Sequence, residues 1–133
     1  MMRIVSAIVL AFCSMWLFCE PAFAERRIAL VIGDSAYERV PQLSNPAHDA
    51  TAMAEMFKGA GFDIVQLKLD LKALEMRRAL RDFSDEARDA DVAIIYFAGH
   101  GIEIQGTNYL IPVDAVLERD IDADDEGFRS SGC

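Results

Sequence analysis

The stretch "RRIALVIG", from Arg26 to Gly33, decides the fold class. Ile28 to Ile32 is a continuous apolar run rich in β-branched residues, and Gly33, Asp34 and Ser35 close it. A strand that is apolar on both of its faces is typical of a parallel sheet covered on both sides. We therefore predict that this stretch is a buried strand in a parallel sheet.

A helix is predicted to follow a polar loop and to begin near Asn45 or Pro46. Asn45 can cap this helix, and proline suits the first helical position. Apolar residues recur with helical spacing and predict one buried face, and two glycines predict the end of the helix. The face consists of Met53, Met56, Phe57 and Ala60, and the glycines are Gly59 and Gly61.

Three further segments complete an alternating pattern of strands and helices. Asp70 is predicted to cap the second helix, which runs to about Arg88. The order strand, helix, strand, helix, strand predicts an α/β fold, a three-layer α/β/α sandwich with a parallel sheet. The predicted strands span 62–69 and 92–97, the helix between them carries Ala73, Met76, Leu80, Phe83 and Ala87 on one face, and a short extended piece covers 109–111.

Polar residues follow the predicted strands where each strand ends. Asp34, the segment 45–49 and His100 all lie at or just beyond these ends. Because sites in parallel sheets lie at the carboxyl ends of the strands, we expect these residues on one rim.

His100 stands between Gly99 and Gly101 directly after the third predicted strand. Flanking glycines allow tight turns and close approach of a substrate backbone. Enzymes of acyl transfer use a histidine as the base and a free backbone amide as the hydrogen-bond donor to the oxyanion. A turn that contains an incidental histidine explains the same three residues, so this motif alone leaves both readings open.

Four stretches in this order and at these spacings resemble the caspase-like cysteine endopeptidases, in their bacterial, metacaspase-related branch. They are "RRIALVIGDSAY", "LSNPAHDATAMAEMFKGAGFDI", "DVAIIYFAGHGIE" and "GTNYLIPVDA". The resemblance covers about Arg26 to Ala115 and implies the caspase-hemoglobinase fold. It also implies a catalytic pair, a histidine after the third strand and a cysteine after the fourth.

The resemblance assigns roles to three residues of this sequence. His100 matches the catalytic histidine, and Gly101 matches the residue whose amide helps to form the oxyanion hole. Asp49 resembles an acidic wall of the pocket that favours Lys or Arg before the scissile bond. Its place in the first turn of a helix equally fits stabilisation of the helix dipole. The implied partner is therefore a protein or peptide substrate.

The sequence departs from the family pattern after residue 115. It has no fourth strand ending in Asp-x-Cys, and Cys133 is the one cysteine beyond residue 24. We expect the amino-terminal part of a peptidase domain, incomplete at its C-terminal side and inactive alone, with a further chain as one source of the missing strands. The alternatives are a non-catalytic pseudopeptidase that serves as an interaction module, or a truncated product without function.

The start of the chain has the layout of a secretory signal peptide. A positive start precedes an apolar stretch from Ile4 to Phe18, and Ala22-Phe23-Ala24 forms a cleavage site. We predict cleavage after Ala24 and export to the periplasm or beyond, whereas a membrane-anchoring helix is the alternative. The predicted organisation is a signal peptide at 1–24, the caspase-like part at 25–115 and an acidic tail at 116–133.

Charge and metal-ligand content narrow the classes of partner. The net charge of −9 argues against nucleic acid and, after signal cleavage, against anionic membrane surfaces. One remaining cysteine and two histidines, His48 and His100, do not suggest a zinc site. An acidic run beginning at Asp120 starts like a calcium loop, but Asp125 and Ser131 occupy the positions that require Gly and Glu. We expect no metal and no cofactor.

Overall fold

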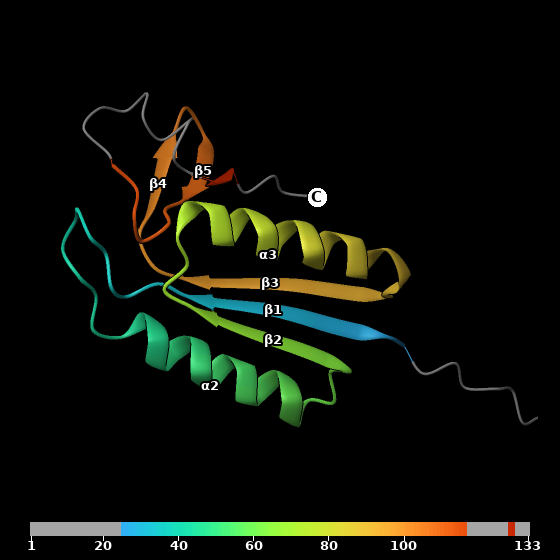
Figure 1. Cartoon of the computed structure of the whole chain (residues 1–133). Helices are drawn as coiled ribbons and strands as arrows, with labels where there is room; N and C mark the ends of the chain where they lie inside the picture. Colours follow the sequence, from blue (N-terminus) through green and yellow to red (C-terminus); the bar gives the residue numbers. More distant parts are fainter. Residues whose placement is uncertain (1–24, 117–127, 130–133) are drawn as a thin grey trace, which may run out of the picture.

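A computed structural model describes residues 25–116 and 128–129 of the chain. A parallel sheet lies between helices α2 and α3, and a small antiparallel sheet stands beside the ends of its strands (Figure 1). The predicted three-layer α/β/α arrangement with a parallel sheet is thus confirmed. The elements are β1 (Arg27–Gly33), α2 (Pro46–Gly59), β2 (Ile64–Leu69), α3 (Ala73–Glu86), the 3-10 helix η1 (Ala87–Asp89), β3 (Val92–Ala98), β4 (Gly101–Ile104), β5 (Thr107–Leu110) and β6 (Phe128–Arg129).

Strand β1 is the central strand of the main sheet, whose order is β2-β1-β3. Both neighbours run parallel to it, and Ile28 pairs with Ile64 on one side and with Ala93 on the other. Every residue from Ile28 to Ile32 is fully buried. The prediction of a parallel strand covered on both faces is therefore confirmed.

Alternate residues of β1 point into two separate hydrophobic cores. Ile28, Leu30 and Ile32 pack with residues of α3, among them Met76 and Phe83. The intervening side chains pack against α2 on the opposite face; this second core comprises Ala29, Val31, Ala50, Ala54 and Phe57. Small residues on this side let α2 approach closely, and a Cβ placed on Gly33 would lie 2.6 Å from Cβ of Ala50. Glycine at the end of β1 is therefore a requirement of packing.

Helix α2 begins at Pro46 as predicted, but its predicted cap is wrong. The Asn45 side chain makes no capping hydrogen bond. Instead, Oγ of Ser35, in the loop after β1, accepts the Ala47 N–H at 3.1 Å. The predicted apolar face is also partly wrong, because Met56 is 53% exposed, while the buried residues are Pro46, Ala50, Ala54 and Phe57.

Asp70 does not cap α3, which corrects the second capping prediction. It adopts a positive φ of 54°, and its Oδ1 accepts N–H bonds from Ser35 and Ala36, each 2.8 Å long. The helix begins three residues later, at Ala73, and the N–H of the preceding Lys72 donates to the Glu75 side chain. The Asp70 carboxylate is thus used across the sheet edge to hold the loop after β1.

A hairpin that the sequence patterns did not predict follows His100. Strands β4 and β5 pair antiparallel, with Gln105 and Gly106 as a two-residue loop. Both loop residues have positive φ, 51° and 78°, as a type I′ turn requires. Strand β6 pairs with Tyr109 and Leu110 of β5, so two residues of the predicted acidic tail join this sheet. The predicted signal peptide and the rest of that tail lie outside the described residues.

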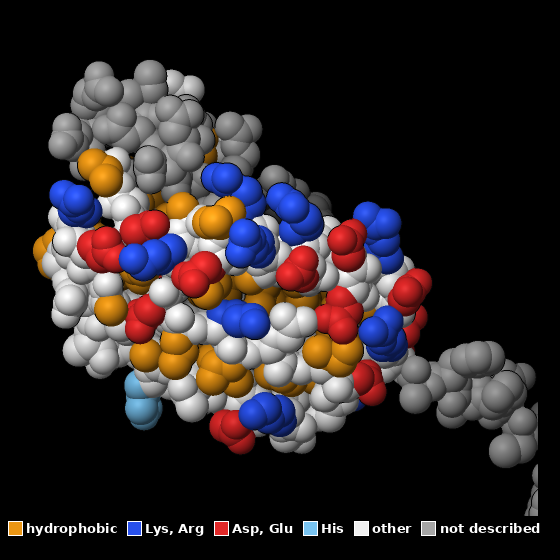
Figure 2. Space-filling model, in the orientation of Figure 1, with side chains coloured by type: hydrophobic (Ala, Val, Ile, Leu, Met, Phe, Trp, Pro, Cys, Tyr) orange, Lys and Arg blue, Asp and Glu red, His pale blue; other side chains and the backbone are white. Residues whose placement is uncertain are grey.

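Charged side chains of both signs are interspersed over the face shown in Figure 2, with hydrophobic side chains between them. Several large apolar residues are exposed, among them Leu74 at 54% and Ile95 at 49%. Within residues 25–116, each helix is too short or too polar to span a bilayer.

Candidate active site

His100 lies where the loops after β1 and β3 meet. Strand β3 ends at Ala98, and the carbonyl of that residue accepts the N–H of Asp34, just beyond β1, at 2.8 Å. This bond joins the carboxyl ends of the two strands. His100 therefore lies at the carboxyl ends of the parallel strands, as its position after the third strand predicted.

Two residues of the loop after β1 hold His100. The hydroxyl of Tyr37 accepts the His100 backbone N–H at 2.7 Å. The carbonyl oxygen of Pro41 lies 2.9 Å from Nε2 of the imidazole. The rings of Tyr37 and His100 also pack edge to face, with centroids 4.5 Å apart. Both the backbone and the ring of the histidine are thus fixed from one loop.

The Pro41 contact determines which imidazole nitrogen carries the proton. A carbonyl oxygen can only accept, so Nε2 carries the hydrogen and donates it. In the neutral imidazole, Nδ1 then has a free lone pair. This arrangement leaves Nδ1 able to take a proton from a nucleophile placed beside it.

The glycines on either side of His100 differ in what they do. A Cβ on Gly99 would lie 2.6 Å from the Tyr37 hydroxyl and 2.7 Å from Cζ of Phe97, so the backbone passes too close for a side chain. Gly101 is exposed at the start of β4 and is paired with Leu110. Because Ile111 donates to the His100 carbonyl and ladder pairs alternate, the Gly101 N–H points away from β5.

A buried acidic group lies on the same rim. Asp34 is fully buried, its Oδ1 accepts the Leu71 N–H at 2.8 Å, and its Oδ2 has no partner. Burial raises the pKa of this carboxyl from 3.8 to about 7; the Leu71 bond opposes the shift and the charge of Asp70 adds to it. Asp34 is therefore the titratable group most altered by its surroundings among those described here.

Asp49 lies in the first turn of α2, and its described contacts are within that helix. Its N–H donates to the Asn45 carbonyl, and its carboxylate is half-exposed, 3.8 Å from Nδ1 of His48. The position suits an interaction with the helix dipole, and the exposure leaves the carboxylate open to a ligand. Of the three predicted site residues, His100 and Gly101 are neighbours at the start of β4, whereas Asp49 lies on α2.

Sequence reasoning missed Tyr37 and Pro41. Pro41 acts through its backbone carbonyl, which any residue type supplies, so no pattern could have singled it out. Tyr37 offered a weak signal, since it is an aromatic residue in an otherwise polar loop. Its burial to 3% exposure becomes visible only in the fold.

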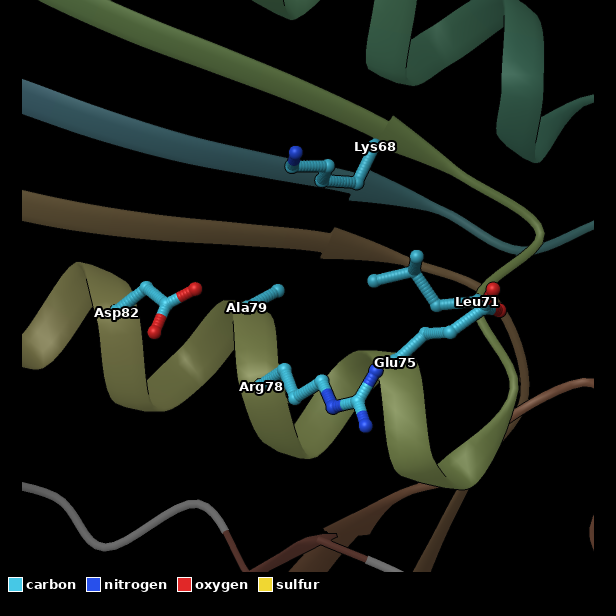
Figure 3. A pocket seen from close by; sticks show the side chains of 6 residues that line it. All are labelled: Lys68, Leu71, Glu75, Arg78, Ala79 and Asp82. Carbon is cyan, nitrogen blue, oxygen red and sulfur yellow. The ribbon is translucent and has the colours of Figure 1, made fainter.

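A separate hollow lies between β2 and α3 (Figure 3). Its lining includes two basic and two acidic side chains, together with two apolar residues: Lys68, Leu71, Glu75, Arg78, Ala79 and Asp82. The hollow contains none of the predicted site residues. Among residues 25–116 and 128–129, no three His, Cys, Asp or Glu side chains gather closely enough to hold a metal ion.

Comparison with known proteins places this fold and rim in one family. A family model described as the caspase domain matches residues 26–133. The human mucosa-associated lymphoid tissue lymphoma translocation protein 1 is 35% identical over 96 residues, which are 72% of this chain and 12% of that protein. Caspase-1 of Equus caballus is 30% identical over 96 residues, 69% of this chain and 24% of that protein.

The chain belongs to the caspase family, a family of cysteine peptidases. The predicted family is therefore confirmed, and the sheet with helices on both faces is the described part of a caspase-like fold. The chain spans 12% and 24% of the length of these two relatives.

Proposed function

We propose that this protein acts as a cysteine endopeptidase in which His100 is the general base. The observation that carries the proposal is the contact between His100 Nε2 and the Pro41 carbonyl, because it leaves Nδ1 free to accept a proton. A structural histidine in a turn needs no such arrangement. The base would stand at the carboxyl ends of the strands, where parallel sheets place their sites.

The proposed chemistry uses His100 first as a base and then as an acid. Nδ1 takes the proton of a cysteine thiol, and the thiolate attacks the scissile carbonyl. The outward-pointing Gly101 N–H stabilises the resulting oxyanion. The imidazolium then returns its proton to the leaving amine, and water hydrolyses the thioester. These reaction steps neither gain nor lose protons overall, and they require no metal or cofactor.

The nucleophilic thiol must come from outside the described residues, because residues 25–129 contain no cysteine. In the described part of the chain, β3 pairs only with β1, and Ile95 on it is 49% exposed. We propose that a further strand pairs with this free side of β3 and brings the thiol to the rim. The strand would belong to the same chain or to a partner chain.

Asp49 is proposed to select a basic residue before the scissile bond. Its carboxylate is half-exposed on α2 and carries charge that Lys or Arg would complement. The net charge of −9 would also attract basic polypeptides. Substrates with Lys or Arg at this position are therefore expected to be cleaved in preference to acidic ones. Asp49→Asn should lower that preference and leave the hydrolysis of other substrates unchanged.

The decisive test is hydrolysis of Arg- and Lys-containing peptides by the gene product, including any sequence that follows Cys133. His100→Ala should lower kcat by roughly 10²- to 10⁴-fold, the usual contribution of a general base. The matched control is His48→Ala, since His48 is exposed on α2. It lies 3.8 Å from Asp49 but transfers no proton in the proposed chemistry, so its kcat should be unchanged. Equal activity of the His100→Ala variant and the control would refute the assignment of His100 as the base. A lack of hydrolysis by the unchanged gene product would favour a pseudopeptidase.

The 133-residue chain alone is expected to show no cleavage of Arg- or Lys-containing peptides and no His100-dependent labelling of Cys133 by a thiol-directed acylating probe. If it does cleave, and both His100→Ala and Cys133→Ser abolish the cleavage, Cys133 is the nucleophile. Export is proposed with it, from the signal layout of residues 1–24. Amino-terminal sequencing of the secreted protein should then begin at Glu25, whereas an intact Met1 on membrane-bound protein would support an anchor.

A further inference from the structure

We infer that Tyr37 is a positioning residue that holds the backbone and ring of His100 where the Pro41 carbonyl can accept the Nε2 hydrogen and so keep one tautomer. The inference deepens the proposed function and rests on it, since a position matters most for a group that transfers a proton. Tyr37 itself touches neither the reacting thiol nor the substrate carbonyl in this scheme. It acts through its contacts with His100.

The hydroxyl of Tyr37 makes two hydrogen bonds whose directions are fixed by their partners. The His100 backbone N–H can only donate, so the hydroxyl accepts at 2.7 Å. The Ile111 carbonyl can only accept, so the hydroxyl donates to it at 3.1 Å. Burial raises the pKa of Tyr37 to about 12, so its proton stays on the oxygen at neutral pH. One hydroxyl thus ties the loop after β1 to both sides of the β4–β5 hairpin.

The ring of Tyr37 supplies the second contact. It packs edge to face on the His100 imidazole, with 4.5 Å between centroids. Pro41 follows four residues later in the same loop and holds Nε2. Tyr37 therefore holds the backbone and one ring edge while Pro41 holds a ring nitrogen. A shift of this loop would move both restraints at once.

The packing around the hydroxyl leaves little space for a substitute partner. A Cβ on Gly99 would lie 2.6 Å from the hydroxyl oxygen, so the oxygen rests against the Gly99 backbone. The Tyr37 side chain is 3% exposed. Removing the oxygen would thus leave the His100 N–H and the Ile111 carbonyl without their present partner in a buried place, which a protein avoids.

The experiment is NMR of the ¹⁵N-labelled 133-residue chain and its Tyr37→Phe variant. Long-range ¹H–¹⁵N spectra report the tautomer of each imidazole, and His48, whose side chain is 88% exposed, serves as the internal reference. The intact chain should show His100 as the Nε2–H tautomer. In Tyr37→Phe the His100 signals should move toward the averaged pattern of His48, and exchange of the His100 amide should become about tenfold faster, the loss of one hydrogen bond.

Tyr96→Phe is the matched control, because it removes a tyrosine hydroxyl from β3 in the packing against α2. It should leave the tautomer and the amide exchange of His100 unchanged. Unchanged His100 signals in Tyr37→Phe would overturn the inference. If that variant does not fold, the intact chain still decides: a tautomer ratio equal to that of His48, or an unprotected His100 amide, overturns it. None of these signals depends on peptide hydrolysis, so the experiment can support or overturn the role of Tyr37 even if the protein proves to have no peptidase activity.

Discussion

Asp34→Asn should remove a large part of the pH dependence of stability. The carboxyl of Asp34 is fully buried, and its Oδ2 has no hydrogen-bond partner. Ionisation therefore places a poorly solvated negative charge near Asp70, which raises the pKa from 3.8 to about 7. Asparagine keeps an oxygen that can accept the Leu71 N–H and carries no charge at any pH.

The size and sign of the effect follow from the pKa. A folded-state pKa above the unfolded value means that the folded protein binds the proton more tightly. The stabilisation is complete below the unfolded pKa and is lost as the pH rises from about 4 to about 7. At 1.36 kcal/mol per pKa unit, the loss in the free energy of unfolding is at most about 4 kcal/mol.

The assay is urea unfolding, followed by circular dichroism, at pH values from 4 to 8. The free energy of unfolding of Asp34→Asn, minus that of the unchanged chain, should increase with pH and level off above pH 7. A constant cost of burying the amide shifts this difference equally at every pH and leaves its slope intact. Asp89→Asn, at an exposed position of η1, is the control and should follow the unchanged chain. Parallel curves for Asp34→Asn and the unchanged chain would refute the reasoning.

Three further predictions concern packing and the sheet edge. Met76→Ala, at a fully buried position, should lower the free energy of unfolding by about 2–5 kcal/mol. Leu74→Ala, at a 54% exposed position of the same helix, should change it little, and equal losses in urea unfolding would contradict this. Gly33→Ala should lower the free energy of unfolding by about 1–3 kcal/mol, because the new Cβ would lie 2.6 Å from that of Ala50. Gly59→Ala, whose Cβ meets open space, is the control in thermal unfolding, and an unchanged stability of Gly33→Ala would show that α2 can move. Ile95→Lys should increase the monomer fraction in size-exclusion chromatography, because lysine on an edge strand opposes strand pairing between chains. The control is Leu74→Lys, on a helix, and an equal gain there would point to general surface hydrophobicity.

The sheet and both main helices could be predicted because their signals are local. The apolar run 28–32 and the spacing of Met76 and Phe83 each define an element without reference to other parts of the chain. The two helix caps could not be predicted in this way. Ser35 reaches α2 because α2 packs against β1. Asp70 turns back to the loop after β1 because β1 and β2 lie side by side.

The candidate site was predicted in part for the same reason. His100 and Gly101 stand in a motif next to a strongly apolar strand, so sequence order alone locates them. The partners of His100 are a buried hydroxyl and a backbone carbonyl from a loop more than fifty residues earlier. The hairpin was missed because β4 and β5 are each four residues long and their turn lacks the Asn-Gly pair that marks type I′ turns.

The central position of β1 has a consequence for the order in which the protein is made. A ribosome releases β1 before either neighbour, and Ile28 can meet Ile64 only after α2 has emerged and Ala93 only after α3. During that interval five side chains that the finished protein buries completely are exposed to other chains. Pairing over such sequence separations is slow, because the loop must close before any contact compensates for its entropy. The yield of folded protein therefore depends on the time that residues 28–32 spend unpaired before β3 is made, and not only on the stability of the completed sheet.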